Sequence, residues 1–338
     1  MRRVIRAVPY LALLVAVVLP WSTVHLPGLF DGPLNSPGTL QMLAVCLVFG
    51  GLALGYDLLF GRAGLLSFGH ALSIAAGAYG VDILVTHAGW PLAGAVAMTV
   101  PAVGLLAALL GSVALRVTGI AFAMVTLAFA QVGLIVVNRD PAGLTGGEEG
   151  LPLNAGALPD ALVGVANTVN LYWLALAFLV VVTVVVHSID RAPLGRVLTG
   201  LRDDERRIAV AGLSPYRVKL LAFTVSGTLA GLGGATYALV VGGASPHLVS
   251  ADLTLSLIVM AVLGGAGTRW GALAGGILYA YLDQRLARVG GQLPGPFGQP
   301  LFVLGTLFVL AVYFAPGGLA GLSRWIGPLR RAVPVPGR

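Results

Sequence analysis

The stretch from Val165 to His187, VANTVNLYWLALAFLVVVTVVVH, runs for 23 residues without a single Asp, Glu, Lys or Arg. A helix of this length rises about 1.5 Å per residue and crosses the ~30 Å hydrocarbon core of a bilayer. After Ser188 and Ile189 the sequence becomes rich in charge: the window from Asp190 to Lys219 holds eleven of the chain's 33 charged residues. The pattern predicts a membrane-spanning helix that ends in a water-exposed loop.

The charged window has an order of its own. A charged run, Arg202 to Arg207, is followed by Ile208-Ala209-Val210-Ala211-Gly212-Leu213-Ser214-Pro215. Glycine commonly ends a helix and proline cannot continue one, so we predict a short helix ended by Gly212, with Pro215 preventing its continuation. A helix lying in water between two spans is a docking element by shape. We therefore assign residues 188–217 to a cytoplasmic loop that meets a partner.

Composition sets the class of the whole chain. Hydrophobic residues make up 57% of it, charged residues only 10%, and the mean hydropathy is +0.93. That leaves too little polar surface to coat a soluble globule, while the 48 glycines and 20 prolines are well tolerated in bilayer helices. We predict an all-α polytopic membrane protein with one transmembrane domain over residues 1–338.

About ten stretches (8 to 10) are long and apolar enough to be spans. The first either is a retained helix or belongs to a signal peptide, and the absence of a small-x-small cleavage site favours the helix. The eighth and ninth are short and Gly-rich, which is typical of broken or re-entrant segments. The stretches are Val8 to Leu26, Thr39 to Phe60, His70 to Thr86, Pro91 to Leu115, Thr118 to Val137, Val165 to His187, Val218 to Gly242, Leu253 to Leu263, Gly271 to Ala287, and Pro300 to Phe314.

The distribution of basic residues predicts the orientation. With ten spans, the turns at Arg62, Arg116 and Arg269, the charged window and both termini fall on one side, which the positive-inside rule identifies as the cytoplasm. The acidic loop 138–164 is then extracytoplasmic. The net charge of +7 faces anionic lipid headgroups, and nucleic acid need not be invoked as a partner.

The sequence lacks the residues that several functional classes require. The only lysine, Lys219, is not preceded by glycine, so there is no phosphate-binding loop for ATP hydrolysis. The histidines are not spaced for a metal, and no nucleophile elbow is present. We therefore expect neither an enzyme nor a bound cofactor or metal. Charged residues within the predicted spans, which an ion-coupled carrier needs, are few and mostly close to span ends: Asp57, Asp82, Asp252, Asp283 and Arg285.

Two Gly-rich segments look specialised. In Gly55 to Ala71, glycines at 61, 64 and 69 interrupt two spans. This segment is either unwound backbone buried at membrane depth or an ordinary cytoplasmic turn. In the extracytoplasmic loop, a flexible polar stretch suits contact with an external partner or an entering solute; its residues are Thr145, Gly146, Gly147, Glu148 and Glu149.

Six motifs in order resemble the permease subunits of branched-chain amino acid ABC importers, of the type that pairs with a second, related permease. They are Gly55 to Ala71, Phe122 to Gln131, Thr145 to Leu151, Arg202 to Glu205 with Ala211-Gly212 and Lys219 to Phe223, Val262 to Thr268 with Trp270-Gly271, and Phe314 to Leu319. The resemblance implies a multi-pass protein of the bacterial plasma (inner) membrane. It also implies three kinds of partner besides lipid: a second permease, two ATP-binding cassette subunits that use ATP and Mg²⁺, and an extracytoplasmic solute-binding protein.

The resemblance further implies site residues. Coupling to the ATPase falls on Arg202, Asp203, Asp204, Glu205, Arg206, Arg207, Ala211, Gly212 and Pro215, and the pathway or gate on Asp57, Gly61, Gly64, Ser67, Gly69, His70, Thr126 and Gln131. Two departures stand out. Arg206-Arg207-Ile208 replaces the importers' Glu-Ala-Ala, and Asp57 stands where the family has asparagine, so we expect Arg62 to neutralise it.

On this basis we predict that the protein takes part in the ATP-driven uptake of branched-chain or related amino acids. Related permeases carry urea, short amides or aromatic acids, and these solutes stay open. An ion-coupled secondary transporter and a membrane scaffold are the alternatives from other classes.

Overall fold

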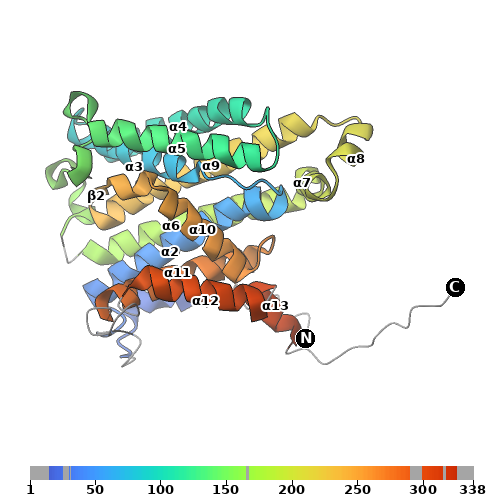
Figure 1. Cartoon of the computed structure of the whole chain (residues 1–338). Coiled ribbons are helices and arrows are strands. Elements are labelled where there is room, and N and C mark those ends of the chain that lie inside the picture. Colours follow the sequence, from blue (N-terminus) through green and yellow to red (C-terminus); the bar gives the residue numbers. More distant parts are fainter. Residues whose placement is uncertain are drawn as a thin grey trace.

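The computed structural model describes residues 15–25, 30, 32–164, 167–289, 299–314 and 317–325. These residues form a helical bundle (Figure 1) with one two-stranded antiparallel ribbon, in which β1 (Leu151–Pro152) pairs with β2 (Gly243–Ala244). The larger helices are α2 (Pro37–Asp57), α3 (His70–Thr86), α4 (Leu92–Ala114), α5 (Ile120–Arg139), α6 (Thr168–Arg191), α7 (Pro193–Asp203), α8 (Glu205–Val210), α9 (Pro215–Val241), α10 (Ala251–Gly264), α11 (Arg269–Val289), α12 (Pro300–Phe314) and α13 (Gly318–Trp325).

Six of the described helices are long and apolar enough to cross a membrane, and α3 and α10 are shorter apolar helices. The six are Pro37–Arg62, Leu92–Ala114, Ile120–Arg139, Thr168–Arg191, Pro215–Val241 and Pro300–Gly321. The chain is therefore a multi-pass helical membrane protein, as its composition predicts. A total of about ten spans stays a prediction, because most of Val8 to Leu26 and both termini lie outside the described residues.

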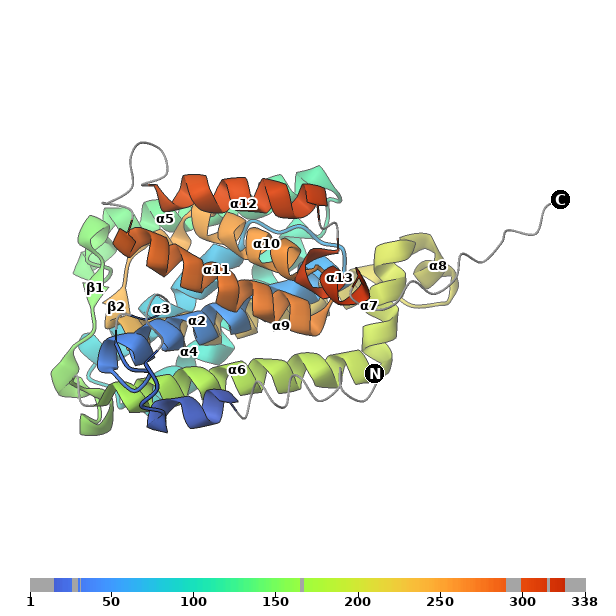
Figure 2. The ribbon, with the colours of Figure 1, turned by 90° about the horizontal axis from the view of Figure 1, so that it is seen from below.

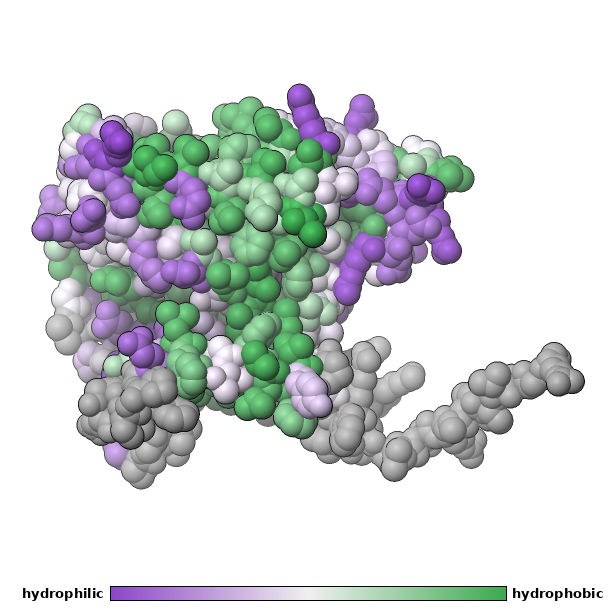
Figure 3. Space-filling view, viewed as in Figure 1, coloured by the Kyte–Doolittle hydropathy of each residue, from purple (hydrophilic) through white to green (hydrophobic). Residues whose placement is uncertain are grey.

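The bundle has two different ends. At one end α7 and α8 project as an arm, and at the other lie the ribbon and the loop 140–164 (Figures 1 and 2). We call these the arm end and the ribbon end. On the face seen in Figure 3, apolar side chains gather over the middle and hydrophilic ones at both ends, as a bilayer requires.

The two halves of the bundle repeat one pattern in opposite directions. At the arm end, α2 is followed by the irregular segment 63–69 and the 17-residue α3; at the ribbon end, α9 is followed by segment 242–250 and the 14-residue α10. The two short helices rise only about 25 Å and 21 Å, less than the hydrocarbon thickness. Of the two predicted short spans, α10 is a short helix after a segment that turns back into the bundle, whereas α11 is a continuous helix of 21 residues.

Contacts between helices follow the same two-fold pattern. α2 packs on α11 and α9 on α4, while each short helix packs on the helix after it. The starts of the short helices meet at Thr254, whose hydroxyl donates to the carbonyl of Phe68 at 3.2 Å and accepts from the amide of Ala71 at 3.1 Å. Such opposed, interrupted helices are an arrangement that transporters use around a pathway.

Glycine allows the closest of these approaches. A Cβ atom on Gly234 of α9 would lie 1.9 Å from the carbonyl oxygen of Ile74 in α3, and one on Gly77 would lie 1.9 Å from that of Gly231. Backbone therefore touches backbone where α3 crosses α9. Small residues serve this purpose in membrane helices, where packing replaces the hydrophobic effect as the force between helices.

Candidate functional site

The Gly-rich segment 63–69 is irregular backbone that is only partly buried: Ala63 and Ser67 are buried, whereas Gly64 and Leu66 are exposed. A π-helical turn, Leu58–Arg62, ends α2, and the chain then re-enters the bundle. Its polar groups are satisfied by hydroxyls: the amide of Phe68 donates to Thr126 at 3.0 Å, and that of Gly69 to Ser67 at 3.2 Å. Both hydroxyl side chains are buried. Such pairing is what irregular backbone needs where water is absent. The segment combines features of both sequence alternatives, because it carries buried hydroxyl pairing and also exposed residues.

His70 joins three helices at the start of α3. The hydroxyl of Ser226 donates to the carbonyl of Gly55 at 2.7 Å, so it accepts from His70 Nε2, also at 2.7 Å. The Nε2-protonated tautomer follows, and Nδ1 has no hydrogen-bond partner among the described residues. The ring also contacts Tyr56 edge to face, with ring centroids 4.9 Å apart. His70 thus holds α2, α3 and α9 together. The sequence pointed to His70 as a site residue but not to its partner Ser226.

A cluster of four charged side chains lies at the arm end beneath segment 63–69. Arg62, only 7% exposed, forms its shortest contacts with Asp190, at 2.8 Å from Nε and 3.2 Å from Nη2. Its Nη1 lies 3.4 Å from Asp57, and Arg269 lies 3.2 Å from Asp190. The expected contact between Arg62 and Asp57 is confirmed. The sequence analysis did not predict Asp190 as the main partner of Arg62. Its position at the predicted cytoplasmic end of a span could have indicated it.

The same cluster is tied to backbone. Asp57, fully buried, accepts a hydrogen bond of 2.7 Å from the amide of Gly267, in the turn between α10 and α11. Arg202, at the end of α7, donates to the carbonyl of Gly61. Its side chain also packs against Gly64, where a Cβ atom would lie 3.0 Å from Arg202 Cγ and where φ is +70°. The arm therefore contacts the turn that precedes α3 directly.

The arm differs in detail from the sequence prediction. Arg202 and Asp203 end α7, and Asp204 caps a separate helix, α8, by accepting from the amide of Arg206 at 2.9 Å. The charged run Arg202 to Arg207 is therefore not one helix. It contains the junction between α7 and α8, with Asp204 as the cap between them. Gly212, with φ at +82°, turns the chain as expected, but Pro215 begins α9 at its first turn, where proline is favoured.

The remaining predicted coupling residues face water around this junction. Glu205, 2.5 Å from Lys219 of α9, fastens α8 to the bundle. The other residues of the set are exposed: Asp203, Arg206, Arg207 and Ala211. At the tip, Val210 is 89% exposed and Leu213 44%.

The extracytoplasmic-loop candidates divide into two groups. Asp140 accepts from the amide of Thr145 at 2.6 Å and from that of Gly146 at 3.1 Å, and these donors hold the pKa of its carboxyl below the usual range. Thr145 is buried and its hydroxyl lies 2.8 Å from the carbonyl of Val137, so it shapes the loop and is not a flexible contact residue. Glu148 and Glu149 are exposed on the turn that follows.

One predicted pathway residue stands apart. Gln131 lies on the exposed face of α5, away from the hydrogen bond that Thr126 makes to segment 63–69. The structure thus brings together Asp57, Gly61, Gly64 and Arg202, and separately Ser67, Gly69, His70 and Thr126.

Comparison with known proteins agrees with this architecture. Residues 38–313 match the family described as branched-chain amino acid transport system / permease component. The chain is 30% identical over 319 residues to the high-affinity branched-chain amino acid transport system permease protein LivM of Escherichia coli (strain K12), covering 86% of this chain and 71% of that protein.

Two further likenesses are more distant. The probable branched-chain amino acid transport permease protein LivM of Methanocaldococcus jannaschii is 23% identical, covering 83% of this chain and 94% of its own. PsaBC from Streptococcus pneumoniae in complex with Fab aligns at a TM-score of 0.44 and 14% identity, over 82% of this chain and 91% of the other. On the family match and the Escherichia coli relative, the chain belongs to the branched-chain amino acid transport system permease family, whose members are transport subunits and not enzymes.

Proposed function

We propose that this chain forms half of the membrane pathway of an ATP-driven importer of branched-chain or related amino acids. Its partners are a second, related permease, two ATP-binding subunits that use ATP and Mg²⁺, and a solute-binding protein at the ribbon end. The arm and both termini face the cytoplasm of a bacterial cell, and the chain itself binds no nucleotide. The family and the names of its relatives support the solute class.

One observation carries the coupling role: the arm is tied to the bundle on its inner side and apolar at its outer tip. Arg202 and the pair formed by Glu205 and Lys219 face inward, whereas Val210 and Leu213 face solvent. Exposed apolar residues with a charged rim are typical of a protein contact. The arm thus offers a docking surface and a rigid connection behind it.

Its inner contacts suggest how a movement is passed on. When ATP closes the ATP-binding subunits, a displaced arm pulls on Gly61 through Arg202 and on Arg62 through Asp190. Gly61 precedes α3, and Gly267, bonded to Asp57, follows α10. Both short helices are therefore moved from their arm-end turns, and their meeting point near Thr254 changes with them.

The test is Val210→Asp, with Leu144→Asp as a matched control. Both residues are exposed and apolar, at 89% and 38%, but Leu144 lies in the ribbon-end loop. We expect Val210→Asp to abolish co-purification of the ATP-binding subunits and ATP-driven leucine uptake, while Leu144→Asp retains both. Uptake driven by an ion gradient in proteoliposomes without ATPase would overturn the proposal. Calorimetric titration of the solute-binding protein with leucine, urea, short amides and aromatic acids identifies the solute.

A further inference from the structure

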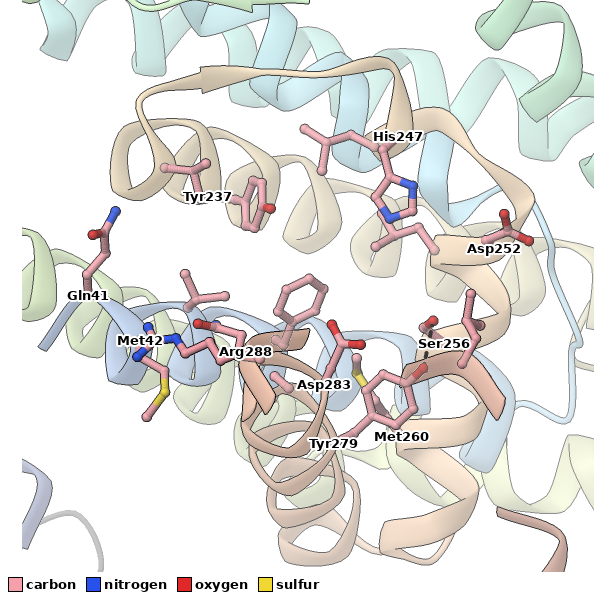
Figure 4. A pocket seen from close by; sticks show the side chains of 18 of the residues that line it. Gln41, Met42, Tyr237, His247, Asp252, Ser256, Met260, Tyr279, Asp283 and Arg288 are labelled. Atoms are coloured by element: carbon pink, nitrogen blue, oxygen red, sulfur yellow. Dashed lines mark hydrogen bonds between the residues drawn. The ribbon is translucent and has the colours of Figure 1, made fainter. Parts of the chain in front are cut away.

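A cavity of about 490 Å³ opens in the ribbon half of the bundle, between α2, α9, α10 and α11 (Figure 4). Its volume lies within the range that proteins use to hold small molecules. None of its lining residues belongs to the hydroxyl-lined segment 63–69 or to the ion cluster at the arm end. It is therefore a separate feature of the chain.

Polar groups from three elements converge on this cavity. In Figure 4 the carboxylate of Asp283 in α11, the hydroxyl of Tyr237 in α9 and the ring of His247, just before α10, point into the same space. A carboxylate within a membrane helix is costly unless it meets water or a partner. Asp283 is exposed to the cavity, which makes it available to an entering cation.

The rest of the wall combines apolar and aromatic side chains with further polar ones, among them Gln41, Gln284 and a second carboxylate, Asp252. Phe49, Val45 and Met260 line it beside Tyr237. The hydroxyl of Tyr279 lies 3.1 Å from that of Ser256, which fixes the Tyr279 ring as part of the wall. Aromatic faces attract cations, and apolar side chains favour an aliphatic group. Arg288 also lines the cavity and supplies a positive charge in the same space.

A second cavity provides a contrast. It has a volume of about 290 Å³ between α3 and α4, and Thr99 is the only polar side chain among its described lining residues. Such a surface suits a lipid chain. Of these two cavities in the described part of the chain, the one at Asp283 has the carboxylate, the tyrosines and the cation.

We propose that this cavity binds a solute that carries a primary ammonium group and a short aliphatic chain, with the ammonium at Asp283 and the chain against Phe49 and Met260. The inference rests on the proposed function in one respect: the solute is an amino acid passing through the importer, held for a time by this chain. It assigns Asp283 of this chain as a specificity-determining carboxylate.

A thiol-protection experiment tests the site. The single cysteine, Cys46, is buried, so a second cysteine reports on its own surroundings. Ser256→Cys places a thiol in the cavity, and Ser214→Cys, in the exposed loop between α8 and α9, is the control. Membranes holding the full chain with its partner subunits are treated with a water-soluble methanethiosulfonate, with L-leucine or its deaminated analogue 4-methylpentanoate present.

L-leucine at about ten times its Kd slows labelling of Ser256→Cys about tenfold through occupancy, and leaves Ser214→Cys unchanged. The analogue, which lacks the ammonium, gives no protection. Adding Asp283→Asn raises the protecting concentration about tenfold or more, measured against the unprotected labelling rate of that same variant, because a charge-assisted hydrogen bond is lost.

Three results would each overturn the proposal: no labelling of Ser256→Cys, equal protection by both compounds, or full protection in the Asp283→Asn background. The unprotected labelling rate also reports whether the variant is folded. Leucine uptake by the unmodified importer is measured in parallel. Uptake without protection refutes this site and leaves the transport function standing, whereas the absence of ATP-driven uptake refutes the function itself.

Discussion

Replacing Asp190 by alanine should loosen the end of α6, from which the arm continues, from α2 and α11. Asp190 ends α6 and joins Arg62, at the end of α2, to Arg269, at the start of α11. Its removal leaves the Arg62 guanidinium, 7% exposed, with only the 3.4 Å contact to Asp57. The perturbation therefore affects three helices through one side chain.

The geometry sets the magnitude. Breaking a buried ion pair by removing one partner costs about 3–5 kcal/mol, because the other charge stays buried. Here Arg62 keeps Asp57, and the Asp190 side chain is 20% exposed, so water replaces part of what is lost. We expect a loss of about 2–3 kcal/mol in the free energy of unfolding, most of it as coupling between Asp190 and Arg62.

A pair of double-mutant cycles measures this coupling. Asp190→Ala and Arg62→Met form one cycle; Asp204→Ala and Arg207→Met form the control, whose pair is 3.3 Å apart but 42% and 86% exposed. Unfolding in mixed micelles of increasing SDS content reports the free energies. We expect a coupling of about 2 kcal/mol in the first cycle and under about 1 kcal/mol in the second. Equal couplings would refute the role assigned to the ion cluster.

Three further outcomes are expected. Gly234→Ala should destabilise the protein by about 3 kcal/mol, because its Cβ would lie 1.9 Å from backbone. Gly305→Ala is the control and should be neutral, because nothing lies within 4 Å of its Cβ. Thermal unfolding in detergent measures both variants, and equal effects would contradict the packing. Lys219→Met should free Glu205 and speed proteolysis of the arm, while leaving the ribbon-end loop as resistant as before. The lowered pKa of Asp140 means that its hydrogen bonds stabilise the loop above the ordinary Asp range, near pH 4, and that this stabilisation is lost as the pH falls through the folded value. The protection factors of the loop amides, which correct hydrogen exchange for its intrinsic pH dependence, should fall on acidification, but not in Asp140→Asn, whose protection is already low at neutral pH.

The positions of the helices follow from local sequence. The predicted span His70 to Thr86 has the bounds of α3, and Thr118 to Val137 differs from α5 by two residues at each end. Charge likewise located the arm between two spans. These predictions succeed because apolar length and a run of charge are properties of one segment, whatever its neighbours are.

Contacts between distant segments were less predictable. Arg62 was expected to meet Asp57, five residues away, but its shorter contacts are with Asp190, 128 residues away. Gln131 was grouped with Thr126 on one motif, yet the helix turns its side chain to the exposed face. Convergence of Asp283 and His247 on one cavity depends on how α11 and the segment before α10 pack together.

The sequence by itself determined a helical membrane protein, the positions of the apolar helices that the structure describes and the charged arm, because a bilayer tests each stretch of about 20 residues separately for polarity. Its motifs likewise pointed to the family. Only the tertiary structure decided that segment 63–69 is held by Thr126 and that Arg202 contacts Gly61 before it. It also decided which carboxylate neutralises Arg62. The reason is that these choices depend on the register in which helices cross, which small residues such as Gly77 and Gly234 set through close backbone contact.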